Sequence, residues 1–198
     1  MNRLRNHMAY LAGSMDDGRE DGKVWRDILT PFLESMGVVV MNPYYKPLCS
    51  QTHSKEVLED DKNFLEIREC LKNKDYDEVK RRFKQVRAID LRLVDKADFL
   101  IAYLDFDKIM TGTMEEIFMA NRQRKPVIIL SSKPKNELPP WYFGAFPHEV
   151  FFETINEVQN YLAYINGVHD IDLLGNRWVF FDIPEKVTVI TAIMDTTV

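Results

Sequence analysis

Apolar runs alternate along the chain with segments whose apolar residues recur at helical spacing. The apolar runs are residues 7–13, 38–43, 97–105, 125–132 and a short stretch within 148–153. A strand that is covered on both faces is apolar at nearly every position, so we interpret these runs as buried strands. Strands that alternate with helices predict an α/β protein built on a parallel sheet.

The segment between the first two strands has a clear helical pattern. Its apolar positions are Val24, Trp25, Ile28, Leu29, Phe32, Leu33 and Met36. Thr30-Pro31 interrupts the pattern and leaves two alternatives. The first is one kinked helix, and the second is a new helix with Thr30 as N-cap and Glu34 closing a capping box. Gly37 is expected to end the helix.

Residues 44–96 differ in character, because they are rich in Lys, Arg, Asp and Glu and almost free of glycine. Two apolar faces at helical spacing predict two helices that are joined near residues 73–77 and whose charged outer faces are solvated. Helices are also expected at 113–124 and at 154–165, the latter with Thr154 as its N-cap.

The last part of the chain changes pattern again. Residues 177–183 and 186–193 are both β-prone and are separated by a Pro-Glu pair, which predicts a candidate β-hairpin. The expected organisation is a domain over residues 1–165 with a charged helical insertion at 44–96, followed by a C-terminal extension over residues 166–198.

Composition and charge exclude several functions. The 198 residues include 26 Lys and Arg and 31 Asp and Glu, a net charge of −5, whereas a protein that neutralises nucleic-acid phosphates is normally basic. No segment approaches the roughly 18–20 apolar residues that span a membrane. Two cysteines and four scattered histidines suggest neither a disulfide framework nor a metal site, and no cofactor is expected. The N-terminus resembles the start of a fold rather than a signal peptide, so a cytoplasmic protein is expected.

Ligands bind at the carboxyl ends of the strands in a doubly wound sheet, so the loops that follow strands are candidate sites. The first of these loops runs from Gly13 through Ser14 and Gly18 to Arg19. Backbone N–H groups, a hydroxyl and a guanidinium suit a phosphate or a sugar hydroxyl, but the chemistry alone favours a polar turn whose aspartates cap the next helix. The loop matches neither a Walker A motif nor a GxGxxG fingerprint.

Acidic residues around the third strand form a second candidate group. The segment from Thr111 to Glu116 opens a helix, where a carboxylate is either favoured by the helix dipole or is a nucleophile at the mouth of the sheet. Asp105 ends the third strand and is expected to face a ligand, whereas Asp98 precedes the strand and is expected to be structural. No Ser-His-Asp or Cys-His arrangement is recognisable.

Five segments, in this order, resemble the nucleoside 2-deoxyribosyltransferase family. They are AYLAGSMDDGRED, VVVMNP, DLRLVDKAD, FLIAYLD and GTMEEIFMANRQRKPVIIL, and together they extend over about residues 8–165. The resemblance implies a flavodoxin-like doubly wound parallel sheet, which agrees with the pattern of strands and helices. It also implies an enzyme of nucleotide salvage that cleaves the N-glycosidic bond of a nucleoside or its 5′-monophosphate without a cofactor.

The resemblance implies roles for individual residues. Glu116 matches the family's nucleophile by its spacing from Gly112, and Glu115 is its neighbour one residue away. Asp90 matches an aspartate that positions the sugar or transfers a proton, and Tyr10 matches a tyrosine that approaches the nucleophile. The expected substrate-binding residues are Gly13, Ser14, Gly18, Arg19, Asp105, Thr111, Gly112 and Thr113.

The first loop resembles the branch of the family that hydrolyses 2′-deoxynucleoside 5′-monophosphates, in which the matching Ser, Gly and Arg hold the 5′-phosphate. Sugar transfer to a second base and hydrolysis are therefore both open. Phe118 stands where the family usually has glycine, which leaves a third alternative, a nucleotide-binding module without catalysis. The family implies a nucleoside or nucleotide and a nucleobase as partners, and a homo-oligomer whose subunits share active sites.

Overall fold

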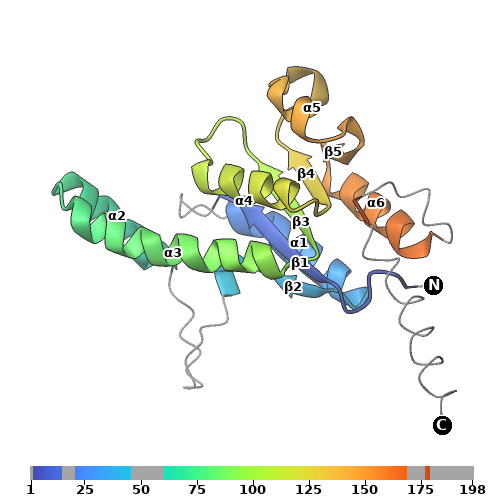
Figure 1. The fold of residues 1–198 in the computed structure, drawn as a ribbon, viewed down its shortest axis with the longest axis horizontal. Helices are drawn as coiled ribbons and strands as arrows, with labels where there is room; N and C mark the ends of the chain where they lie inside the picture. The colour runs from blue at the N-terminus through green and yellow to red at the C-terminus, as the bar shows by residue number, and fades with distance from the viewer. Residues whose placement is uncertain (1, 15–20, 46–59, 169–176, 179–198) are drawn as a thin grey trace, which may run out of the picture.

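A computed structural model describes residues 2–14, 21–45, 60–168 and 177–178 of the chain. Its centre is one five-stranded sheet in which every pair of neighbouring strands is parallel. The strands are β1 (Met8–Gly13), β2 (Val39–Met41), β3 (Phe99–Leu104), β4 (Val127–Ser131) and β5 (Phe151–Phe152), in the spatial order β2-β1-β3-β4-β5 (Figure 1). This is the strand order of flavodoxin-like folds, so the predicted fold class is confirmed.

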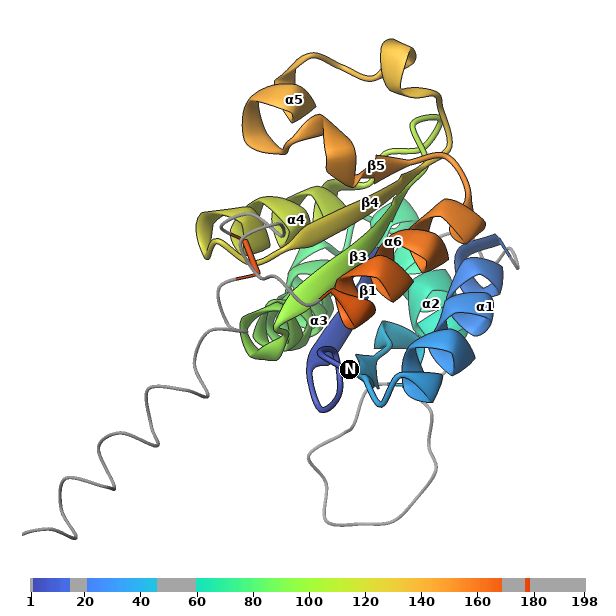
Figure 2. The ribbon, with the colours of Figure 1, turned by 90° about the vertical axis from the view of Figure 1, so that its right-hand side faces the viewer.

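Helices cover both faces of the sheet, as Figure 2 shows. The α-helices are α1 (Asp21–Ser35), α2 (Asp60–Lys72), α3 (Tyr76–Lys96), α4 (Thr111–Arg122), α5 (Trp141–Ala145) and α6 (Ile155–Gly167). Short 3-10 helices are η1 (Pro43–Tyr45), η2 (Lys135–Glu137) and η3 (His148–Val150). Helices α1 and α6 lie on one face, α3 and α4 lie on the other, and α2 packs along α3.

The strands are apolar at nearly every position because each face of the sheet packs against a separate cluster of side chains. Ala9 and Leu11 of β1 belong to the cluster under α1 and α6. Tyr10 and Ala12, which alternate with them, belong to the cluster under α3 and α4. The side chain of Tyr10 is thereby directed to the same face of the sheet as α3 and α4.

The helix between β1 and β2 is continuous, with Pro31 inside it, so the alternative of a second helix that begins at Thr30 is wrong. Pro31 is exposed, and water can therefore reach the carbonyl of Asp27 that the proline cannot bond. Gly37 follows the helix with φ of 74°, and its N–H donates to the carbonyl of Glu34 at 2.8 Å. A positive φ costs glycine little, which explains why the helix ends there.

The remaining predicted elements are found at or near their expected positions. The two helices of the charged insertion are α2 and α3, and α3 is capped by Asp75, whose carboxylate accepts from the N–H of Glu78 at 3.2 Å. Helix α5 was not predicted, because its five residues are too few to show a helical period. The candidate hairpin falls almost entirely outside the described residues, and the division at residue 165 stays a prediction.

Candidate active site

A pocket of about 280 Å³ lies at the carboxyl ends of the central strands, between α3 and α4. Three segments form it: the end of β1, one face of α3, and the loop and first turns of α4. The sequence-predicted residues that line it are Tyr10, Gly13, Ser14, Asp90, Thr111, Gly112, Thr113 and Glu116. Residues separated by up to 106 positions in the chain therefore meet at the edge of the sheet where this fold binds ligands.

Tyr10 and Glu116 form a buried pair at this pocket. Tyr10 is 1% exposed and Glu116 is 7% exposed, and the phenol oxygen lies 2.8 Å from Oε1 of the carboxylate. Burial raises the pKa of Tyr10 well above its ordinary value, and the negative charge of Glu116, with that of Asp90 in its ionised form, raises it further. The phenol therefore stays protonated and donates its hydrogen bond to the carboxylate.

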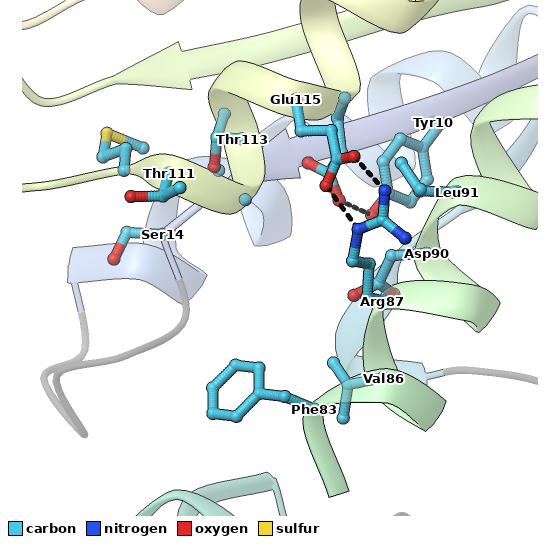
Figure 3. Close-up of a pocket in the computed structure, with 14 residues that line it drawn as sticks. Tyr10, Ser14, Phe83, Val86, Arg87, Asp90, Leu91, Thr111, Thr113 and Glu115 are labelled. Carbon is cyan, nitrogen blue, oxygen red and sulfur yellow. Dashed lines mark hydrogen bonds and ion pairs between the residues drawn. The ribbon is translucent and has the colours of Figure 1, made fainter. Parts of the chain in front are cut away.

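Glu115, one residue earlier, has different surroundings. Its carboxylate accepts from Nε of Arg87 at 2.7 Å and from Nη2 of the same guanidinium, an ion pair that links α4 to α3 (Figure 3). The hydrogen bond from Arg87 lowers the pKa of Glu115. The buried face of α4 consists of Thr113, Glu116, Ile117 and Ala120, which places Glu116 toward the sheet and Glu115 at the helix edge.

Helix α3 forms the opposite wall of the pocket. Phe83, Arg87 and Asp90 follow at helical spacing on one side of this helix, and Figure 3 shows them along one wall. Asp90 is half-buried, and its charge acts on the phenol of Tyr10. Asp90 was expected at the site from the resemblance, whereas Phe83 and Arg87 were not among the predicted site residues. The available signal was their spacing, because Phe83 and Arg87 precede Asp90 by seven and three residues and so share its side of the helix.

The ends of two chain segments complete the pocket. Gly13 and Ser14 lie at the end of β1, and Thr111 and Gly112 lie at the start of α4. Two hydroxyl groups and the backbone at a helix start suit an oxygen-rich ligand. The predicted phosphate-binding residues Gly18 and Arg19 lie outside the described residues.

The structure does not bring Asp105 to this pocket. Its Oδ2 lies 3.3 Å from Nζ of Lys108, and its Oδ1 accepts from the N–H of Asp107 at 3.1 Å, so the carboxylate closes its own turn instead of facing the cavity. Asp98 has the structural position that was expected, because its Oδ2 accepts from the N–H of Met8 at 2.8 Å and so holds the start of β1.

Phe118, the departure from the family pattern, does not line this pocket. Its ring stacks on Tyr142 with centroids 6.3 Å apart and lies 5.6 Å from the ring of Phe146. Both partners are near α5, a helix that the sequence analysis did not predict. The large side chain is therefore accommodated by aromatic packing around α5.

The described residues show neither a metal-binding cluster nor a membrane-spanning helix. Among them, no group of three or more His, Cys, Asp or Glu side chains is arranged to hold a metal ion. Within the same ranges, no helix is both long and apolar enough to cross a membrane.

Comparisons with known proteins give matches only at the level of structure. No protein-family model matches the sequence, and no curated protein matches it significantly. A 2-deoxyribosyltransferase from the psychrotolerant bacterium Bacillus psychrosaccharolyticus is similar with a TM-score of 0.50 and 19% identity, over 78% of this chain and 91% of that one. The CMP N-glycosidase BcmB of Clostridium botulinum has a TM-score of 0.45 and 18% identity, over 79% and 98% of the two chains. The first of these similarities, together with the strand order, establishes a flavodoxin-like α/β fold for this chain.

Proposed function

We propose that this protein cleaves the N-glycosidic bond of a (2-deoxy)ribonucleoside or its 5′-monophosphate and transfers the sugar to another base. The observation that carries the proposal is the buried carboxylate of Glu116, which is hydrogen-bonded by Tyr10 in a pocket that Asp90 also lines. One carboxylate for nucleophilic attack and a second carboxyl group for proton transfer are what retaining displacement at an anomeric carbon requires. The order of the family-like sequence motifs supports the same reaction.

In the first step, a carboxylate oxygen of Glu116 attacks C1′ of the sugar while the bond from C1′ to the base nitrogen breaks. The electron pair of that bond goes to the base, and the carboxylic acid form of Asp90 supplies the proton that the base requires. The product is an ester between Glu116 and the sugar. The transition state resembles an oxocarbenium ion, which the adjacent negative charge stabilises.

In the second step, a ring nitrogen of another base attacks C1′ and the ester bond to Glu116 breaks. Asp90, now a carboxylate, takes the proton from the incoming base and returns to its starting state. Tyr10 orients the carboxylate in both steps through its hydrogen bond at 2.8 Å. No cofactor enters this cycle, because the protons and electron pairs balance between the two bases and the two carboxyl groups.

Hydrolysis of a 2′-deoxynucleoside 5′-monophosphate is the second candidate function. The feature that favours it is the first loop, GSMDDGRED, with its resemblance to the hydrolase branch. In this version water replaces the incoming base and Asp90 accepts a proton from it. The two reactions share the first step and differ only in the acceptor.

Product analysis by chromatography and mass spectrometry distinguishes these reactions. Each nucleoside and each 5′-monophosphate is incubated with and without a second free base. A new nucleoside that forms only when the base is added establishes the transferase, and free sugar or its 5-phosphate without added base establishes the hydrolase. If no member of either series is cleaved, the protein is a binding module and the proposal is wrong.

The role of Glu116 is tested against its neighbour. We expect Glu116→Gln to lower kcat at least about a thousandfold, because an amide is not a competent nucleophile. Glu115→Gln breaks only a partly exposed ion pair, so a loss of less than about tenfold is expected. Mass spectrometry of the protein after rapid quenching should detect the sugar ester in the wild type and not in Glu116→Gln. Equal losses in the two variants would contradict the assignment.

A further inference from the structure

Arg26 of α1 is an arginine with no exposed surface (0%), in the interior beside the candidate active site. Its guanidinium donates three hydrogen bonds to backbone carbonyls: Nε to Leu11 at 3.2 Å, Nη2 to Gly13 at 3.0 Å, and Nη1 to Gly22. Burial of a cation is costly unless its donors are satisfied, and within the described residues these three carbonyls are its hydrogen-bond partners.

The three carbonyls belong to two segments on either side of the β1–α1 connection. Leu11 and Gly13 are in the last half of β1, and Gly22 is in the first turn of α1. One side chain therefore fixes the distance between the end of the strand and the start of the helix. Because Gly13 and Ser14 line the pocket, the geometry of this pocket wall depends on where the guanidinium lies.

The guanidinium itself is held firmly. Its Cζ lies 4.5 Å from the centroid of the Trp25 ring and 5.2 Å from that of Tyr44. A Cβ atom added to Gly13 would lie 3.0 Å from Nη2 of Arg26 and 3.1 Å from the Trp25 ring, which is closer than ordinary packing. The end of β1 thus fits against the guanidinium with room only for glycine.

Arg26 remains a cation under physiological conditions. Burial lowers the pKa of Arg26 to about 10, and the phenols of Tyr44 and Tyr10 and the carboxylate of Glu116 act in the opposite direction. Stability alone is a weak reason to bury such a charge, because well-packed apolar side chains often stabilise a protein as well or better. The contacts of the guanidinium instead indicate that it has a role at the pocket wall.

We propose that Arg26 is a positioning residue: its three-way contact with Leu11, Gly13 and Gly22 fixes the Gly13–Ser14 wall against which the substrate binds. The inference rests on the proposed function, since it assigns the wall to substrate binding and the chemical step to other residues. It therefore predicts a selective loss of substrate affinity. The planar guanidinium is essential to this three-way contact, because one Lys ammonium cannot reach three carbonyls in that arrangement.

The test compares Arg26→Lys and Arg26→Gln with the wild type in steady-state kinetics. We expect KM to rise about tenfold in both, the size of effect that follows loss of a charge-assisted hydrogen bond, with kcat within about threefold. A purely structural role would lower kcat with the fraction of folded protein and leave KM unchanged. A purely electrostatic role would leave Arg26→Lys normal. Either of these results overturns the proposal.

Arg122→Lys is the matched control, since Arg122 is exposed in the last turn of α4 and undergoes the same chemical change. Its KM should equal that of the wild type. Thermal melting of each variant shows whether it is folded. If neither Arg26 variant folds, Arg26 acts in folding alone and the proposal is overturned.

Equilibrium binding separates this inference from the proposed function. If the wild type cleaves no nucleoside or nucleotide, the proposed function fails, and titration calorimetry with 2-deoxyribose 5-phosphate still tests the pocket wall. Binding to the wild type that weakens about tenfold in Arg26→Lys, the same loss of a charge-assisted hydrogen bond, supports the inference. Absence of binding to the wild type, or equal binding to both proteins, overturns it.

Discussion

The hydrogen bond between Tyr10 and Glu116 connects the middle of β1 with the second turn of α4, so two elements must be correctly placed for it to form. The bond orients one oxygen of the carboxylate and leaves the phenol neutral, because the pKa of Tyr10 is raised by burial and by the charges of Glu116 and Asp90. A small change to this tyrosine therefore tests how far orientation of Glu116 contributes to the reaction.

We expect Tyr10→Phe to lower kcat by about ten- to a hundredfold, because misorientation of a reacting group has effects of this size. KM should change little, since the ring and its packing are retained. The free energy of unfolding should fall by about 1 kcal/mol, the usual contribution of a buried hydrogen bond. Steady-state kinetics measures kcat and KM, and urea unfolding measures the free energy of unfolding.

The control for this variant is Tyr142→Phe. Tyr142 is also buried, and its hydroxyl lies 2.8 Å from Sδ of Met114, but it does not line the pocket. Both variants lose one hydroxyl from the core on the same side of the sheet. If Tyr142→Phe reduces kcat as much as Tyr10→Phe does, the loss results from general destabilisation of the core. The role of Tyr10 in orienting Glu116 is then contradicted.

Residue spacing predicted which side chains meet at the pocket better than it predicted how they are oriented. The resemblance selected Glu116 by its spacing from Gly112, but helical position alone does not separate it from Glu115, since both are acidic residues in an early turn of a helix. The choice depends on which face of α4 packs on the sheet. Arg26 escaped prediction for a similar reason, because the charge of an arginine suggests exposure and only tertiary contacts reveal its burial.

At the scale of elements, helix α6 has a complete capping box that the sequence signalled through Thr154. The hydroxyl of Thr154 accepts from the N–H of Glu157 at 3.2 Å. The carboxylate of Glu157 accepts in return from the N–H groups of Thr154 at 3.1 Å and of Glu153 at 2.9 Å. These bonds satisfy donors that a helix start otherwise leaves open.

Thr154→Ala should lower the free energy of unfolding by about 1 kcal/mol, the typical cost of removing an N-cap side chain. Urea unfolding measures this change.

Glu157→Gln tests how the stability that the cap provides depends on pH. The backbone hydrogen bond from Glu153, then that from Thr154, lowers the pKa of Glu157 below its ordinary value of 4.5. The folded state therefore binds the proton less readily than the unfolded state, and the charged carboxylate stabilises the fold above pH 4.5.

The melting temperature of Glu157→Gln should accordingly lie below that of the wild type at neutral pH, and the gap should close as the pH falls through the lowered pKa of the folded state. Melting curves at a series of pH values measure it. Glu149→Gln is a suitable comparison, because Glu149 lies in the short helix η3 and contributes no cap to α6. A gap that stays constant with pH would contradict the capping role of the Glu157 charge.

Long elements with a clear period were predictable, and short ones were not. Helices α1, α3 and α6 and the strands β1, β3 and β4 have enough residues to show their period. Helix α5 has five residues, and its Tyr142 packs against Phe151 and against Phe106, of which the latter precedes the helix by more than a whole helix and strand in the chain. Contacts of this kind leave no periodic signal in the local sequence.

At the scale of the whole molecule, the charged segment at 44–96 and the residues after α6 both contribute to the fold, and α3 is the helix that connects back to the sheet at β3. Helix α3, the second helix of the charged insertion, supplies Asp90 and a wall of the pocket, and its last turns pack into the core through Leu93 and Val94. The charged segment thus forms part of the pocket, whereas its description as an insertion stays a prediction. Arg3, before β1, donates a hydrogen bond from its Nε to the carbonyl of Val168, directly after α6, at 2.5 Å.

Trp178 shows that the C-terminal extension also contributes to the core. Its side chain is 2% exposed and belongs to the cluster under α1 and α6. The ring lies 5.6 Å from the ring of Phe99, at the start of β3, and Nε1 is 3.4 Å from the hydroxyl of Tyr161 in α6. A residue well beyond the predicted domain boundary at 165 thus closes the amino-terminal end of the sheet.

Replacement of Trp178 by alanine should therefore lower the free energy of unfolding by about 3–5 kcal/mol, because it leaves a large cavity beside Phe99. Trp141→Ala is the matched control: this side chain is 79% exposed, so a change within about 0.5 kcal/mol is expected. Urea unfolding followed by circular dichroism measures both. Equal small effects would mean that the extension contributes nothing to stability and that the domain ends at residue 165. A large effect confined to Trp178 would mean that truncation before this residue removes part of the hydrophobic core itself.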